Sequence, residues 1–413
     1  MIRVIIADDS SFMRKVLSDL FTTAPDFEVV ATASDGSEAV KLVSRLKPDL
    51  VTMDVNMPLM NGLQALEMIM EACPTPVIMI SSLTKKDADE TIRALQLGAV
   101  DFITKAGGSV SRIDTIKDEI LEKSRSAATA KVKKIVNNEN ILGKKQEAAN
   151  LKRINILERK GVTTPNRGIN SSSVVASRLK PVSHVTATSR TSSVLSHHSS
   201  ITEKIAKRDN PYLKMRQAHG GASGERKLIA LGTSTGGPKA LQYVVPKLPA
   251  DMPCGMVIVQ HMPAGFTKSL AERLDDMSQV KVKEAEDMEP ILPGCVYIAP
   301  GDYHMEITGN GSQRVISLNQ NPPLAAHRPA VDIMFDSVAQ YGGDVVSVIL
   351  TGMGCDGTAG MKKIKKAGGY VIAESQETCV VYGMPKAVVD AGLSDEVLPV
   401  QNIAEAIMNA VRK

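Results

Sequence analysis

The sequence predicts an α/β protein with two folded domains joined by a long basic connector. Short apolar runs alternate with amphipathic stretches in residues 1–123 and again in residues 225–413, which is the pattern of strands followed by helices. The 413 residues suffice for two or three domains, and in residues 124–224 the alternation stops. We therefore expect a first α/β domain, a connector and a second α/β domain, in that order.

The first domain is predicted to be a five-stranded (βα)5 unit. Residues 11–21 and 62–72 have helical spacing and lie between apolar runs of strand type. Strands that alternate with helices pair in parallel, and five such units make one small domain. The predicted strands cover residues 3–7, 27–33, 49–55, 76–81 and 100–104.

The connector carries most of the positive charge. Residues 124–224 hold 19 Lys and Arg and 5 Asp and Glu, a net charge of +14, whereas the whole chain carries +4 and the remainder therefore −10. Tyr212 is the one aromatic residue between Ile103 and Gln242, so this Ser- and Thr-rich segment cannot bury enough apolar surface to offset its ordering entropy. We predict a disordered linker. It is a solvated spacer, a partner of the acidic domains, or a means of peripheral association with anionic membrane lipid.

The second domain, residues 225–413, is long enough to bury a core of its own. Its apolar runs read as buried strands of a second α/β domain. These runs cover residues 227–232, 255–260, 295–300, 344–352 and 369–374.

Composition argues against a membrane protein, a secreted protein and a nucleic-acid-binding protein. The chain has no run of about 18 apolar residues and no signal peptide at its start, and its five cysteines lack zinc or redox spacing. We therefore expect a cytoplasmic protein. Acidic domains argue against a nucleic-acid partner, and no helix-turn-helix follows the first domain, which argues against a transcription regulator.

Acids, a hydroxyl and a lysine lie at the ends of four of the predicted strands of the first domain. The first strand ends in Asp8 and Asp9, the third in Asp54, the fourth in Ser81 and the fifth in Lys105. The carboxyl ends of parallel strands face one crevice, so these groups should converge. Clustered carboxylates suit Mg²⁺, and a carboxylate beside Mg²⁺ and an ammonium group can accept a phosphoryl group.

This pattern resembles response-regulator receiver domains along the whole segment. The resemblance implies phosphorylation of Asp54 by a histidine kinase, and Mg²⁺ held by Asp8, Asp9, Asp54 and the backbone carbonyl of Asn56. It also implies that Ser81 senses the phosphoryl group, that Phe102 is the switch aromatic and that Lys105 pairs with the acyl phosphate. Ala106 departs from the pattern, because many receivers have proline after the lysine.

The stretch GTSTGGP, residues 232–238, places Ser234 in a G-x-S-x-G turn directly after a strand. Such a serine can be a nucleophile if a histidine and a carboxylate lie nearby. His261 follows the next strand and is the better candidate for the base; His327, in a loop, is the second, and His304 lies within a predicted strand. Asp356 follows the most apolar strand of the domain and is the candidate carboxylate.

The region around Asp356 also fits a different function. Gly352, Gly354 and Gly357 spell G-x-G-x-x-G between a strand and a helix, and Glu374 ends the next strand, as in a dinucleotide-binding output domain. Two points oppose this alternative: Asp356 would repel a pyrophosphate, and few strands follow the motif. The order serine, histidine, aspartate also differs from that of α/β-hydrolases.

Four segments, GTSTGGP, VIVQHMP, HRPAVDIMF and ILTGMGCDGTAGM, together resemble the catalytic domain of the CheB family of chemotaxis response regulators. The resemblance implies a doubly wound, mostly parallel sheet and a protein-glutamate methylesterase. Ser234 would be the nucleophile, His261 the base, Asp356 its orienter, and the Met353 N–H an oxyanion donor.

The same resemblance also implies which substrates the enzyme acts on and how it is regulated. The substrates would be methylated glutamates of chemoreceptors, with methanol released, and receptor glutamines that are deamidated; the esterase reaction would need no cofactor. An unphosphorylated receiver would inhibit the enzyme, although the long linker departs from familiar members. A catalytically inactive adaptor is the remaining alternative, which the intact set of three residues disfavours.

Overall fold

The computed structural model describes residues 1–82, 84–105, 113–130, 132, 227–311 and 313–413. Two of our expectations fall largely outside this range. Ala106 is not among the described residues, and of the predicted linker only residues 124–130 and 132 are. Helix α5 ends at Ala128, five residues beyond the predicted end of the first domain.

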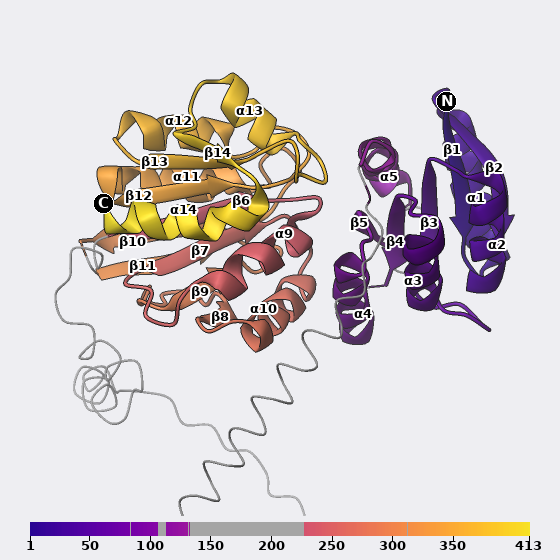
Figure 1. Ribbon diagram of the computed structural model, residues 1–413, viewed down its shortest axis with the longest axis horizontal. Helices are drawn as coiled ribbons and strands as arrows, with labels where there is room; N and C mark the ends of the chain where they lie inside the picture. Colours follow the sequence, from indigo (N-terminus) through magenta and orange to yellow (C-terminus); the bar gives the residue numbers. More distant parts are fainter. Residues whose placement is uncertain (83, 106–112, 131, 133–226, 312) are drawn as a thin grey trace, which may run out of the picture. The chain divides into compact units, whose positions relative to one another are not determined.

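The first domain is a parallel five-stranded sheet with the strand order β2-β1-β3-β4-β5 (Figure 1). This confirms the predicted (βα)5 class. The strands are β1 (Ile2–Ala7), β2 (Phe27–Ala33), β3 (Leu50–Asp54), β4 (Val77–Ser81) and β5 (Asp101–Thr104). The helices are α1 (Ser11–Thr23), α2 (Gly36–Leu46), α3 (Gly62–Ala72), α4 (Lys85–Gln96) and α5 (Ile113–Ala128).

Alternation along each strand divides the core of this domain into two layers. Ile5 and Met53 point to the core that contains side chains of α2, α3 and α4, whereas Val4 and Ile6 point to the core that contains side chains of α1 and α5. Successive strand side chains point to opposite faces, so continuous apolar strands require helices on both faces.

The second domain has seven parallel strands in the order β14-β13-β12-β6-β7-β9-β8 and a separate antiparallel hairpin of β10 and β11. Its strands are β6 (Leu228–Thr233), β7 (Gly255–Gln260), β8 (Lys281–Glu284), β9 (Cys295–Ile298), β10 (His304–Asn310), β11 (Gln313–Asn319), β12 (Val345–Ile349), β13 (Tyr370–Glu374) and β14 (Glu396–Leu398). Sequence patterning missed β8, β11 and β14, which have exposed or half-buried residues among their few apolar ones.

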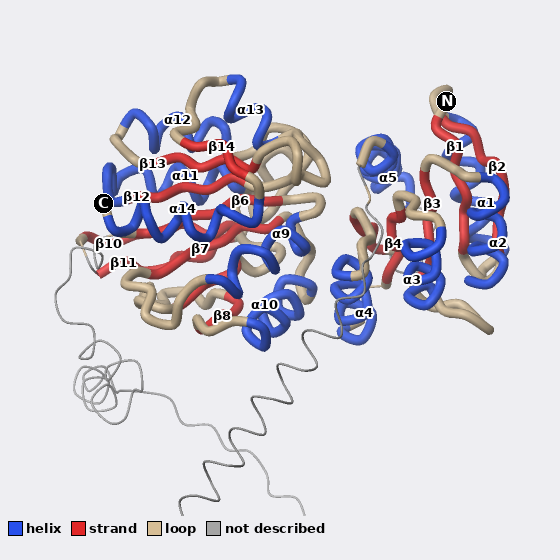
Figure 2. Tube along the Cα trace, in the orientation of Figure 1, coloured by secondary structure: helices blue, strands red, loops and turns tan. Residues whose placement is uncertain are grey.

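Helices cover both faces of this sheet (Figures 1 and 2). Ile229 and Leu231 of β6 belong to the core with α9, α10 and α14, while Leu228 and Ala230 belong to the core with α11, α12 and α13. The helices are α9 (Gly237–Val244), α10 (Phe266–Met277), α11 (Val331–Val338), α12 (Thr358–Lys366), α13 (Met384–Asp390) and α14 (Val400–Arg412), with 3-10 turns at Val245–Lys247 and Ala339–Asp344.

The strand order of the second domain reverses at β6. From β6 the chain moves to β7 on one side, and it later returns to place β12 on the other side of β6. The sheet is therefore doubly wound, as expected, and in such sheets the functional residues gather at the carboxyl ends of the strands where the order reverses.

Candidate active site and acidic pocket

Ser234 lies on a sharp turn between β6 and α9. Its backbone N–H donates to the carbonyl of Thr351 at 3.0 Å, and its carbonyl accepts from the N–H of Gly237 at 2.8 Å. Gly236 caps α9 with a positive φ of 80°, a conformation that glycine adopts without strain. The turn thus places the half-buried Ser234 at the carboxyl end of the central strand.

His261 follows β7 and lies between Ser234 and Asp356. Its Nδ1 is 3.2 Å from Oγ of Ser234, and its Nε2 is 2.8 Å from Oδ2 of Asp356. A carboxylate only accepts hydrogen bonds, so Nε2 carries the proton and Nδ1 is the free base that faces the serine hydroxyl. Ser234 follows β6, His261 follows β7 and Asp356 follows β12. These three strands are neighbours in the sheet, which explains why segments so distant in sequence meet.

Asp356 is held by backbone groups as well as by His261. Its Oδ2 accepts from the N–H of Val331 at 2.7 Å, and its Oδ1 from the N–H of Asp332 at 2.8 Å. These donors are the first N–H groups of α11. Burial raises the pKa of Asp356, but the hydrogen bond from His261 and the two N–H groups outweigh it and leave the pKa below its ordinary value. Asp356 therefore stays ionised opposite the imidazole.

Sequence reasoning missed Gln260, the residue before the histidine. Its side-chain amide donates to the carbonyls of Ser234 at 3.0 Å and His261 at 3.1 Å, and the residue is 2 % exposed. A Cβ on Gly237 would lie 2.0 Å from Oε1 of Gln260, so the glycine makes room for this amide. The sequence signal that could have identified Gln260 is a polar glutamine at the end of the apolar run 255–260, directly before His261.

The other two candidate histidines have different surroundings. His304 is fully buried; its Nδ1 accepts from the N–H of Ala330 at 3.3 Å, and its Nε2 lies 3.2 Å from the carbonyl of Pro322. His327 stacks on His261 with ring centroids 3.9 Å apart. The ring nitrogens that face Ser234 and Asp356 belong to His261, so His327 is adjacent to the three-residue arrangement without replacing its histidine.

Met353 lies two residues after Thr351, which is bonded to the turn around Ser234 (residues 233–237, the serine turn). A Cβ on the preceding Gly352 would be 2.9 Å from Cβ of Ser234, so only glycine allows this close approach. The carbonyl of Gly352 accepts from the N–H groups of Gly383 and Met384 at 3.1 and 2.9 Å, which fixes the peptide that leads into Met353.

The dinucleotide-binding alternative is not supported. Glu374, the acid expected to hold a ribose, is 1 % exposed and accepts from the N–H of Thr351 at 2.8 Å and the hydroxyl of Thr378 at 2.9 Å. Gly352 packs against Ser234, and Asp356 occupies the amino end of α11. The glycines therefore fit a serine turn and a carboxylate, and the ionised Asp356 beside them would repel a pyrophosphate.

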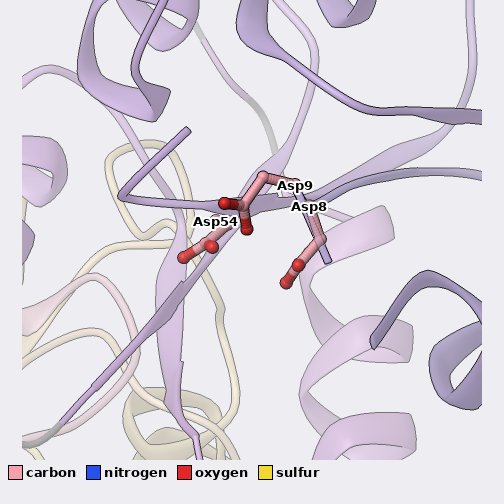
Figure 3. Close-up of side chains that lie close together, drawn as sticks. All are labelled: Asp8, Asp9 and Asp54. Atoms are coloured by element: carbon pink, nitrogen blue, oxygen red, sulfur yellow. The ribbon is translucent and has the colours of Figure 1, made fainter. Parts of the chain in front are cut away.

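The first domain brings Asp8, Asp9 and Asp54 together (Figure 3). One carboxylate oxygen of each lies within 4.8 Å of the others. Nζ of Lys105 is 2.7 Å from Oδ2 of Asp54 and 3.2 Å from Oδ2 of Asp8, so one ammonium group faces the two buried carboxylates. Three carboxylates this close together beside one ammonium group fit Mg²⁺, which prefers such hard ligands.

Burial and ion pairing have opposite effects on the pKa values of Asp54 and Lys105. Burial raises the pKa of Asp54, and the hydrogen bond from Lys105 lowers it only in part. Burial lowers the pKa of Lys105, but the hydrogen bond from Asp54 and the charges of both aspartates raise it above its ordinary value. The pocket therefore holds a protonated lysine against a buried carboxylate.

The other residues predicted for the receiver site are Ser81, Phe102 and the Mg²⁺ ligand Asn56. Oγ of Ser81 accepts from the hydroxyl of Thr91 at 2.8 Å, and Phe102 is buried in β5. The side-chain amide of Asn56 donates to Asp87 at 2.9 Å. Asp87, which sequence reasoning missed, also accepts from the hydroxyls of Ser82 and Thr84 at 2.6 Å each. It thereby joins the loop after β3 to the loop after β4.

An acidic pocket with a paired lysine on a (βα)5 domain, followed by a serine, histidine and aspartate on a doubly wound domain, defines a response regulator with a hydrolase as its output. Comparisons agree with this class. A family model described as response regulator receiver domain matches residues 4–116, and one described as CheB methylesterase matches residues 229–407.

Curated relatives match over nearly the whole chain. The protein-glutamate methylesterase/protein-glutamine glutaminase of Symbiobacterium thermophilum is 41 % identical and aligns with 99 % of this chain and 97 % of its own. The proteins of the same name from Thermotoga maritima and Bacillus subtilis are 41 % and 40 % identical, and the alignments cover 98 % and 99 % of those proteins. This chain belongs to the CheB methylesterase family and carries the family's receiver domain.

A solved structure, the Thermotoga maritima CheB methylesterase catalytic domain, is 49 % identical and covers 44 % of this chain and 97 % of its own, with a TM-score of 0.44. Within the described ranges, no helix combines the length and the apolar character needed to cross a membrane.

Proposed function

We propose that Ser234, His261 and Asp356 perform the protein-glutamate methylesterase and protein-glutamine deamidase reactions of this family. The observation that carries the assignment is the hydrogen-bonded row from Oγ of Ser234 through His261 to Asp356, with distances of 3.2 and 2.8 Å. A nucleophile, a base and an orienting carboxylate in contact are what acyl transfer requires.

The order of steps follows from the atoms. Oγ of Ser234 attacks the ester carbonyl of a methylated glutamate, and its proton moves to Nδ1 of His261. Asp356 fixes the proton on Nε2 and stabilises the imidazolium that forms. The proton then passes to the leaving group, and methanol departs. Water attacks the acyl-enzyme by the same route and restores Ser234; for a glutamine substrate the leaving group is ammonia.

The charge that develops on the carbonyl oxygen needs donors. The N–H of Met353 is the proposed donor, because Gly352 holds this backbone against the serine turn. One such donor is worth roughly 3–4 kcal/mol of transition-state stabilisation.

The receiver domain makes this activity dependent on phosphorylation. Asp54 is the proposed acceptor of a phosphoryl group from a histidine kinase, and Lys105, 2.7 Å away, would pair with the product. Asp8, Asp9, Asp54 and the carbonyl of Asn56 would hold Mg²⁺, which supplies charge neutralisation during the transfer. Ser81 and Phe102 are the proposed residues that respond to it.

The proposed partners are the methylated chemoreceptors and the kinase, and the proposed location is the cytoplasm, where all five free cysteines would stay reduced. For the +14 segment 124–224 we keep peripheral binding to anionic lipid as a proposal, since each basic residue near such lipid contributes about 1 kcal/mol.

The decisive experiment measures methanol release from a methylated receptor by the full-length protein, with and without a small phosphodonor. We expect turnover that rises with the phosphodonor and is lost in Ser234→Ala and His261→Ala. Full activity of a folded Ser234→Ala variant would refute the assignment of the nucleophile.

A further inference from the structure

Thr351 lies between the serine turn and the backbone that leads to Met353. It follows β12 and is 1 % exposed. We propose that Thr351 is a positioning residue, which sets the nucleophile and the oxyanion donor at their working separation. This inference rests on the proposed function of Ser234 and Met353 and assigns a role to a residue that touches neither the substrate nor the base.

One side of Thr351 holds the serine turn. Its carbonyl accepts from the N–H of Ser234 at 3.0 Å and from the hydroxyl of Thr233 at 2.9 Å. Its own hydroxyl donates to the carbonyl of Thr235 at 2.9 Å. The residue before Ser234, Ser234 itself and the residue after it are thus all bonded to Thr351, so the turn cannot rotate without breaking these bonds.

The other side of Thr351 is bonded to Val381 and Glu374. Its hydroxyl oxygen accepts from the N–H of Val381 at 3.0 Å, and a longer contact of 3.2 Å joins it to the carbonyl of Val381. The N–H of Thr351 donates to the buried carboxylate of Glu374 at 2.8 Å. The N–H of Gly352 in turn donates to the carbonyl of Val381 at 3.1 Å, so the peptides before Met353 are held on this side too.

The hydroxyl of Thr351 therefore donates to one backbone segment, at Thr235, and accepts from another, at Val381. Displacing a reacting group by about 1 Å can cost about 100-fold in rate, because catalytic donors act only at the correct distance. Removing the hydroxyl leaves the carbonyl of Thr235 and the N–H of Val381 without this partner. The serine turn and the Val381 segment, which holds the N–H of Gly352, would then lose the hydroxyl that joins them, while the backbone bonds of residue 351 remain.

Three variants of the full-length, phosphorylated protein test this inference through methanol release from a methylated receptor. Thr351→Val keeps the branched shape and removes the hydroxyl, whereas Thr351→Ser keeps the hydroxyl. Ser347→Ala is the matched control: Ser347 is also buried in β12, and its hydroxyl donates to the carbonyl of Tyr370 at 3.0 Å, away from Ser234. Thermal unfolding is measured for each, and kinetics are run well below every Tm.

We expect Thr351→Val to lower kcat by roughly 10- to 100-fold with KM changed less than twofold, since the substrate does not contact Thr351. Thr351→Ser should recover kcat to within about threefold, and Ser347→Ala should leave it unchanged. Equal losses of kcat in Thr351→Val and Ser347→Ala, or an unchanged kcat in Thr351→Val, would overturn the inference. Activity that survives Ser234→Ala would instead refute the proposed nucleophile, so the two failures are distinguishable.

Discussion

The imidazole rings of His261 and His327 lie parallel, with centroids 3.9 Å apart and planes inclined by 12°. The two rings have different chemical surroundings. His261 is bonded to Ser234 and Asp356, whereas burial, and then the neighbouring charge of His261, lower the pKa of His327 to about 4. His327 therefore presents a neutral aromatic surface to its neighbour at neutral pH.

This assignment of roles predicts opposite outcomes for two matched substitutions. His327→Phe should retain most of the activity, because a phenyl ring can still stack on His261. His261→Phe should abolish methanol release, because no nitrogen would remain to take the proton of Ser234. Initial rates for folded variants, verified by circular dichroism, are the measurement. The reverse result would make His327 the base.

The depressed pKa of His327 also predicts a pH dependence of stability. Below its ordinary pKa of 6.5 the unfolded chain binds a proton at this residue that the folded chain excludes until about pH 4. The free energy of unfolding therefore falls as the pH drops from 6.5 to 4, by roughly 3 kcal/mol. In denaturant unfolding at pH 7.5 and pH 4.5, His327→Phe should gain stability relative to the wild type at the lower pH. Identical pH dependence of the two proteins would contradict this.

Asp356→Asn should lower kcat by roughly 10³- to 10⁴-fold, with residual turnover above that of Ser234→Ala. An amide has one acceptor oxygen, so its NH₂ group would oppose either the proton of His261 or an N–H at the start of α11. Methanol release is the readout. Asp336→Asn is the control, because Asp336 is paired with Lys363 on the surface. A loss below tenfold in Asp356→Asn would show that the carboxylate is not needed.

Phosphorylation should require both Asp54 and Mg²⁺. Intact-protein mass spectrometry after treatment with a small phosphodonor should show one added phosphoryl group, which disappears with a chelator or in Asp54→Asn. Asp89→Asn, on the exposed side of α4, is the control and should be modified like the wild type. Stoichiometric modification of Asp54→Asn would place the phosphoryl group elsewhere.

The basic segment 124–224 should bind vesicles that contain anionic lipid, and added salt should release it. Co-sedimentation of the full-length protein at low and high salt measures this, with vesicles of neutral lipid as the control. Absence of binding at every salt concentration would leave the other two alternatives, a solvated spacer and a partner of the acidic domains.

Much of this protein could be predicted from its sequence, because strand ends are visible as places where apolar runs stop. Asp8, Asp54, Ser234 and His261 each follow such a run, and parallel strands bring their carboxyl ends to one edge. The α/β class, the acidic pocket and the serine turn therefore follow from local patterns and one rule of sheet geometry.

Other features depend on which strands are neighbours, and only the tertiary structure decides that. β12 pairs with β6, which brings Asp356 to His261 and Thr351 to Ser234. The same packing places the amino end of α11 against Asp356 and excludes the dinucleotide alternative that the three glycines had suggested. These contacts join residues 24 to 118 positions apart, and hydrogen-bond partners at such separations leave no periodic signal in the sequence.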